Sequence, residues 1–141
     1  IIPVWLKTPD QLSIVAAMLR GETVLRAGDF VADLNYGRVF LAAPADLRRA
    51  IVRSFPITLW GEAAAIARAE SGFNAKAHCL NCIPGVVEDS RGYFQINVNA
   101  HPWARRGDLF TVSWNATAAA RVRNEAVSWR PWSTAAGLGL V

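Results

Sequence analysis

The sequence predicts a mostly α-helical α+β fold, and three observations lead to that prediction. Apolar residues recur with helical spacing in several segments, most regularly over residues 57–70. Residues 74–97 have no helical period and are rich in Gly, Pro, Asn and Asp, which favours loops and a small strand pair. The 141 residues are 52% hydrophobic and 18% charged, so a single domain can bury a substantial core.

Composition also limits the classes of partner. The net charge of +4 suits an anionic partner such as an acidic cell-wall polymer, although solubility alone explains so small a charge. Lys and Arg do not cluster among aromatic residues, so no nucleic acid is expected. No apolar run reaches the roughly 18 residues that a membrane span needs. The chain begins with Ile1 and ends in GLGLV, so residues 1–141 are interpreted as one domain excised from a longer protein.

The first half of the chain contains three predicted elements. A first helix is expected over residues 11–20, after a Thr-Pro-Asp start signal. Strand-like residues within 22–42 flank Asn35-Tyr36-Gly37, which predicts a short hairpin. Pro44 then marks the start of a helix over residues 45–53.

The clearest helix covers residues 57–70, and it ends in an acidic residue. One face of it carries Leu59, Ala63, Ile66, Ala67 and Glu70, and Gly72 is a natural stop. An apolar setting disfavours a charged carboxylate, and so does the negative end of the helix dipole. Glu70 is therefore a candidate general acid. The alternative is a surface Glu that pairs with Arg68 or Lys76.

A further helix is predicted over residues 112–127, after a polar turn. Its inner stripe is expected to consist of Ala116, Ala119, Ala120 and Val127. The chain then becomes irregular and aromatic, and core packing is the simplest role for its tryptophans because large aromatic side chains are mostly buried.

A CxxC pair, Cys79 and Cys82, lies in the irregular region. With His78 and His101 it offers potential zinc ligands, but a single CxxC is a weak metal signal. The same cysteines are compatible with a disulfide in an oxidising compartment or with ordinary thiols. No metal and no cofactor is assigned, and a small zinc-binding interaction domain remains a rival interpretation.

Two strings flank this loop, ESGFNAKA at residues 70–77 and GYFQIN at residues 92–97, and an alanine-rich helix near Asn115 follows. In this order they resemble the soluble lytic transglycosylase and lysozyme-like family. There a Glu-Ser pair closes a helix, and a Gly-Leu-Met-Gln-Ile-like strand follows after a variable loop. The resemblance, over residues 63–127, implies a lysozyme-like domain with a small β-hairpin region near the active-site groove.

The resemblance also implies an activity and a set of site residues. Glu70 would act as general acid/base on the β-1,4 bond between the MurNAc and GlcNAc units of peptidoglycan glycan strands, giving 1,6-anhydro-muramyl ends. The implied substrate-binding residues are Ser71, Tyr93, Phe94, Gln95, Asn115 and Trp132, with His101 and Trp103 as weaker candidates for the groove walls. Ser71 and Gln95 would orient the substrate or the acid, and Tyr93 and Phe94 would form the groove floor.

Two departures leave alternatives open. The family's late Tyr-Asn-Ala-Gly-like segment, whose Tyr approaches the acid, corresponds here to WSTAAG at residues 132–137, with Ala135 in place of Tyr. A glycoside hydrolase needs a second carboxylate, and Asp89 is the best candidate, although Asp-Ser before Arg-Gly is also a turn signature. The alternatives are thus a muramidase that uses Glu70 and Asp89, and a non-catalytic lysozyme-like module that binds glycan or is structural.

The resemblance implies a place of action outside the cytoplasm. The EDSRGYFQIN string and the following His-Pro pair are similar to phage-type members of the family. The expected setting is a phage virion or tail protein or the bacterial periplasm, within a larger virion or secretion-associated protein.

Overall fold

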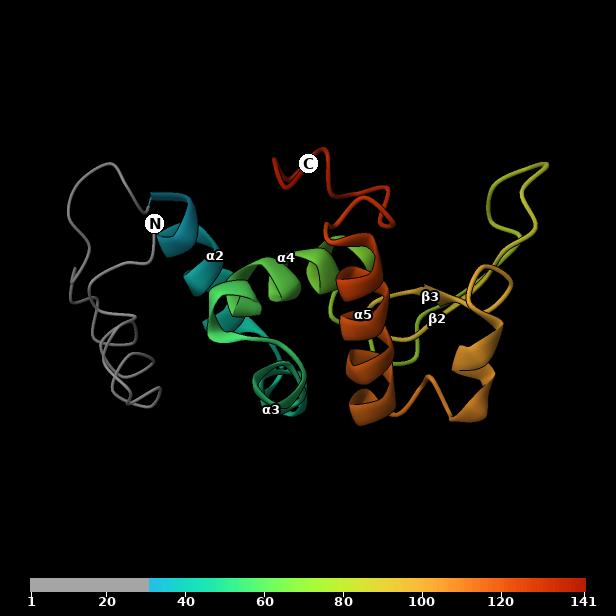
Figure 1. The fold of residues 1–141 in the computed structure, drawn as a ribbon, viewed down its shortest axis with the longest axis horizontal. Helices are drawn as coiled ribbons and strands as arrows, with labels where there is room; N and C mark the ends of the chain where they lie inside the picture. The colour runs from blue at the N-terminus through green and yellow to red at the C-terminus, as the bar shows by residue number, and fades with distance from the viewer. Residues whose placement is uncertain (1–30) are drawn as a thin grey trace.

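The computed structural model describes residues 31–141, and the fold of this range is α+β and mostly α, as predicted (Figure 1). None of the helices in this range is long and apolar enough to cross a membrane. The helices are α2 (Val31–Ala42), α3 (Ala45–Ser54), α4 (Trp60–Ser71) and α5 (Val112–Ala126), with the short 3-10 helices η2 (Ile57–Leu59) and η3 (Pro102–Arg106). The strands are β1 (His78–Leu80), β2 (Asp89–Arg91) and β3 (Ile96–Asn97).

Helix α2 replaces the predicted hairpin over residues 22–42 in the described part of that segment. Asn35-Tyr36-Gly37 lies inside the helix, so the predicted turn is wrong. Val39 and Phe40 are consecutive and both are buried, and the Phe40 ring stacks on Trp60 of α4 at 5.6 Å. Packing against α4 therefore outweighs the local preference of these residues for a strand. The helix predicted over residues 11–20 lies outside the described residues.

Helices α2 and α4 are in close contact at Gly61. A Cβ atom added to Gly61 would lie 2.7 Å from Cβ of Tyr36 and 2.8 Å from its carbonyl carbon, so only a glycine fits without a shift of one helix. Gly61 therefore fixes how closely α2 approaches α4.

The Gly61→Ala substitution is expected to lower the free energy of unfolding by about 1–3 kcal/mol, because the added methyl group overpacks the contact with Tyr36. Denaturant-induced unfolding measures the change. Ala69→Ser is the matched control, because Ala69 is exposed on the same helix. A Gly61→Ala variant as stable as the wild type would contradict this account of the helix contact.

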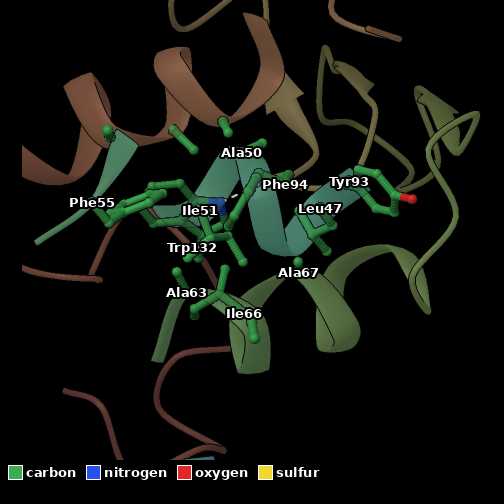
Figure 2. Packing of buried hydrophobic residues seen from close by; sticks show 14 of the residues in the cluster. Leu47, Ala50, Ile51, Phe55, Ala63, Ile66, Ala67, Tyr93, Phe94 and Trp132 are labelled. Carbon is green, nitrogen blue, oxygen red and sulfur yellow. Dashed lines mark hydrogen bonds between the residues drawn. The ribbon is translucent and has the colours of Figure 1, made fainter. Parts of the chain in front are cut away.

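Helix α4 is the central helix of the domain. Its buried residues are Trp60, Ala63, Ala64, Ala65, Ile66 and Ala67, so it is enclosed on almost every side. Leu47 and Ile51 of α3 and the aromatic residues Phe94 and Trp132 pack around it (Figure 2). Gly72 ends the helix in the left-handed conformation, as the sequence predicts.

The predicted strand pair is present and has a third strand beside it. The antiparallel order is β1-β2-β3, with Cys79 opposite Ser90 and Ser90 opposite Asn97. The loop of residues 81–88 between β1 and β2 extends away from the helices (Figure 1). Cys79 and Cys82 form a disulfide at its base, so neither sulfur is a free zinc ligand, and residues 31–141 contain no cluster of metal-binding side chains.

Helix α5 confirms the last predicted helix with one correction. Ala116, Ala119 and Ala120 are buried as expected, but Val127 is 77% exposed and lies just beyond the helix. Val127 adopts the left-handed conformation that ends α5, so it no longer shares the buried face of the preceding turns. The chain from there to Val141 forms irregular turns beside α4 and α5, at the top of Figure 1.

Candidate active site

Glu70 lies in the last turn of α4, at the border between the core and the solvent. Ala67, one turn before it, is completely buried, whereas Ala69 is exposed and Glu70 itself is partly buried. On the predicted apolar face Ala63, Ile66 and Ala67 are buried as expected, whereas Leu59 lies in η2 and is partly buried. Glu70 occupies the rim of that face, where a carboxyl group is partly removed from water and still reachable.

Thr134 is the hydrogen-bond partner of this carboxyl group. Its hydroxyl donates to Oε1 of Glu70 at 2.8 Å. Two neighbours anchor the segment that carries Thr134: the Trp132 indole N–H donates to the Phe94 carbonyl at 2.8 Å, and Ala135 is fully buried. The C-terminal segment is therefore fixed to the core on both sides of Thr134, which holds the hydroxyl against Glu70.

The environment of Glu70 favours its protonated form. Burial of the carboxyl group raises the pKa of Glu70 and is the largest effect. The hydrogen bonds from the Thr134 hydroxyl and backbone N–H lower this pKa, and the negative charge of Glu88 raises it. The net direction is upward, which suits a carboxylic acid that donates a proton near neutral pH.

Ser71 and Gln95 hold the backbone around Glu70 and do not touch its carboxyl group. The Ser71 hydroxyl donates to the Ala67 carbonyl at 2.8 Å, within the same helix. The Gln95 side-chain amide donates to the Ala77 carbonyl at 3.0 Å and to the Gly92 carbonyl at 2.9 Å. Gln95 thus ties the residue before β1 to the turn between β2 and β3. The predicted contact of either side chain with the acid is not formed.

Four of the predicted substrate-binding residues are buried in the core. Phe94 is 0%, Asn115 1%, Tyr93 4% and Trp132 5% exposed, whereas the resemblance implied a groove floor of Tyr93 and Phe94 and substrate contacts for Asn115 and Trp132. The Tyr93 hydroxyl donates to Asp46 of α3 at 3.0 Å. The rings of Tyr93 and Phe94 fill the space between α3, α4 and the C-terminal segment instead of forming a groove floor (Figure 2).

Asn115 has a structural role that links two of the motifs. Its side-chain carbonyl accepts the Phe94 N–H at 2.9 Å, and its amide donates to the carbonyls of Arg91 at 2.8 Å and Leu109 at 2.9 Å. Gly92 lies against it: a Cβ there would be 2.3 Å from Nδ2 of Asn115. The Gly-aromatic segment and the alanine-rich helix are therefore locked together by one buried amide.

The acids Glu88 and Asp89 have different surroundings. Asp89 forms an ion pair with Arg91 at 2.7 Å and a hydrogen bond with the His78 ring at 2.8 Å, and both of its oxygens are occupied. The hydrogen bonds from Arg91 lower the pKa of Asp89 to about 2. Glu88 accepts the Ser90 hydroxyl at 2.8 Å, and it is the acid whose charge acts on the pKa of Glu70. Asp89 thus has a structural role in the sheet, and the negative charge of Glu88 raises the pKa of Glu70.

The other predicted groove residues form an aromatic cluster with α5. The rings of His101 and Trp103 lie 5.8 Å apart, and the Arg121 guanidinium stacks over Trp103 at 3.9 Å. Burial lowers the pKa of His101, so its neutral form is favoured. Among the described residues no hydrogen bond or ring contact joins this cluster to Glu70.

Sequence reasoning missed Thr134, although one signal pointed to its segment. The family resemblance predicts that a late segment approaches the acid, and it places Ala135 at the position of the expected Tyr. Ala135 is instead a buried anchor, and the residue before it supplies the hydroxyl. A sequence gives no measure of which side chain of an irregular segment faces a helix 64 positions earlier.

Comparison with known families identifies the fold. The sequence profile of the family described as lysozyme like domain matches residues 58–134, more than half of the chain. The matched stretch contains the acid at the end of α4, the three-stranded sheet, the Asn115 helix and Thr134. Comparisons with curated proteins and with solved structures found no match. With its acid, sheet and alanine-rich helix inside the matched stretch, the chain belongs to the lysozyme-like domain family.

Proposed function

We propose that this domain is a peptidoglycan lytic transglycosylase, with Glu70 as its general acid/base. Membership of the lysozyme-like family supports a glycan-cleaving enzyme that acts on peptidoglycan, outside the cytoplasm. The observation that carries the finer proposal is the Glu70 carboxyl group at the rim of the core, with a raised pKa and a fixed hydrogen bond from Thr134. The setting we propose is a phage virion or tail protein or the bacterial periplasm.

The proposed reaction needs one carboxyl group in two protonation states. The Thr134 hydroxyl donates to Oε1 of Glu70, and protonated Glu70 delivers its proton to the glycosidic oxygen between MurNAc and GlcNAc. The C1–O bond breaks, the GlcNAc end leaves with the proton, and positive charge develops at C1 of MurNAc. The C6 hydroxyl of the same sugar then attacks C1, and ionised Glu70 takes its proton. The product is a 1,6-anhydro-muramyl end, and no water is consumed.

A muramidase is the second candidate, and one observation favours it. A hydrolase needs a second carboxylate near the scissile bond as nucleophile or base. Asp89 is engaged by Arg91 and His78, which makes it a poor choice for that role. Glu88 is close enough for its charge to raise the pKa of Glu70, so Glu88 would take the place of Asp89 in a hydrolytic mechanism.

Replacing Thr134 with valine tests the part played by its hydroxyl. The hydroxyl hydrogen bond lowers the pKa of Glu70, so its removal is expected to raise that pKa further. The acid would then stay protonated to higher pH, and the alkaline limb of the pH–rate profile should move upward. Thr134→Ser keeps the hydroxyl and should retain the wild-type limb. A Thr134→Val profile identical to the wild type would contradict this role.

Release of soluble fragments from purified peptidoglycan tests the proposed activity against a non-catalytic module. An enzyme is expected to clear a suspension of the polymer and to release muropeptides into the supernatant. A glycan-binding or structural module would sediment with the polymer and leave the supernatant free of fragments. The second result would overturn the proposed function.

A further inference from the structure

A cleft of about 390 Å³ separates the exposed edges of α3 and α5, and it contains neither Glu70 nor Thr134. Helix α3 lines it with residues at helical spacing along one face, and α5 lines it from its first turn onward. The lining consists of Asp46, Arg49, Ala50, Arg53 and Ser54 from α3, and Val112, Ser113, Thr117 and Ala120 from α5. The cleft is therefore formed by two helices and is separate from the candidate active site at Glu70.

Two positively charged side chains of α3 line this cleft. Arg49 and Arg53 are one helical turn apart, and both side chains are exposed. Among residues 31–141 neither guanidinium has a hydrogen bond or an ion pair, in contrast to Arg91 and Arg121, which are paired with acids. Adjacent unpaired guanidinium groups repel each other, and a carboxylate or phosphate between them relieves that repulsion.

The remaining polar groups suit a ligand that also carries hydroxyls. Asp46 is the one acid in the lining, and its Oδ1 is fixed by the Tyr93 hydroxyl at 3.0 Å and the Leu47 N–H at 2.8 Å. Its other oxygen and the hydroxyls of Ser54 and Ser113 have no partner among the described residues. Ala50 and Ala120, which are buried, and the partly buried Val112 form the apolar part of the lining.

We propose that the α3–α5 cleft binds an anionic, hydroxyl-bearing segment of the cell-wall polymer, with its carboxylate or phosphate group between Arg49 and Arg53. The nature of the polymer rests on the proposed function, whereas the anion site rests on the cleft itself. A second contact of this kind keeps the enzyme on the polymer between cleavage events, because rebinding becomes intramolecular. The anionic group has two possible sources, the carboxylates of peptide stems and the phosphates of polymers attached to the wall.

Binding without turnover tests this proposal. The background is full-length Glu70→Gln, which should bind the polymer without cutting it, and the test variant adds Arg49→Gln and Arg53→Gln. The probes are peptidoglycan sacculi stripped of phosphate polymers, and soluble polyglycerol phosphate. The double substitution is expected to weaken binding to at least one probe by about tenfold, which corresponds to about 1.4 kcal/mol. A loss on stripped sacculi identifies carboxylates, and a loss on the soluble polymer identifies phosphates.

The matched control adds Arg38→Gln and Arg130→Gln to the same background, which removes the same charge from exposed sites outside the cleft. The control should bind both probes as the background does. Unchanged binding by the cleft variant, or an equal loss in the control, would overturn the proposal. A variant with Arg49→Lys and Arg53→Lys keeps the charge without the forked donors, so it should recover binding only in part. If the cleft variant binds weakly while Glu70→Gln still cleaves, the proposed function fails and the anion site stands.

Discussion

Replacing Glu70 with glutamine is expected to reduce the rate of glycan cleavage by about 10²–10⁴-fold, because glutamine cannot donate a proton to the leaving oxygen. The amide still accepts the hydrogen bond from Thr134, so the geometry of the site should persist. The measurement is the rate of soluble muropeptide release from purified peptidoglycan. The matched control is Glu125→Gln, an exposed acid on α5 whose ion pair with Arg121 lies on the surface. Cleavage at the wild-type rate by Glu70→Gln would disprove the catalytic assignment.

The same substitution is not expected to unfold the domain. Because burial raises the pKa of Glu70, the folded state holds this proton at pH values where the unfolded chain has lost it. The stability contributed by that proton is complete below the unfolded pKa and is lost as pH rises through the folded pKa. At neutral pH the variant should therefore be at least as stable as the wild type, as thermal unfolding can show. If the Glu70→Gln variant is inactive because it is unfolded, its inactivity does not support a catalytic role of Glu70.

Replacing Asn115 with alanine is expected to lower the free energy of unfolding by about 3–5 kcal/mol. The substitution leaves the Phe94 N–H and the carbonyls of Arg91 and Leu109 without their partner, and each unsatisfied buried group costs about 1–3 kcal/mol. Chemical denaturation measures the loss. Asn124→Ala is the control, since Asn124 is exposed on the same helix and should change stability by less than about 0.5 kcal/mol.

The Asn115 result also decides between two interpretations of the family pattern. The resemblance implied that Asn115 contacts the substrate, whereas the structure shows a 1% exposed amide that organises the backbone before β3. A variant with wild-type stability and a raised KM would restore the substrate contact. A destabilised variant that retains its KM where it is folded supports the structural role.

Much of the helical framework could be predicted from local sequence. The phase of residues 57–70 identified α4 and the position of Glu70 at its end, and Gly72 marked its stop. Helix α2 could not be predicted in this way, because Val39 and Phe40 favour a strand locally, whereas in the fold both are buried and the Phe40 ring stacks on Trp60. The contact between α2 and α4 favours the helix, and a short window of sequence around residues 31–42 does not contain the α4 residues that make this contact.

The site could be predicted in outline but not in its contacts. Resemblance identified the acid and the segments around it, but it could not separate side chains that face the groove from those that face the core. Tyr93 and Phe94 are buried in the core, and the hydroxyl of Thr134 donates a hydrogen bond to Glu70. The adjacent acids show the same limit: Asp89 is paired with Arg91, and Glu88 acts on Glu70.

The chemical form of the cleaved ends tests the central claim most directly. Mass spectrometry of a complete digest of purified peptidoglycan distinguishes 1,6-anhydro-muramyl ends from reducing ends by the mass of one water molecule. A mechanism with Glu70 as the one catalytic carboxyl group predicts anhydro ends, and Glu88→Gln should still produce them. Reducing ends in the wild-type digest would contradict this mechanism. If the Glu88→Gln variant no longer produced those ends, the enzyme would be a muramidase that uses two carboxylates.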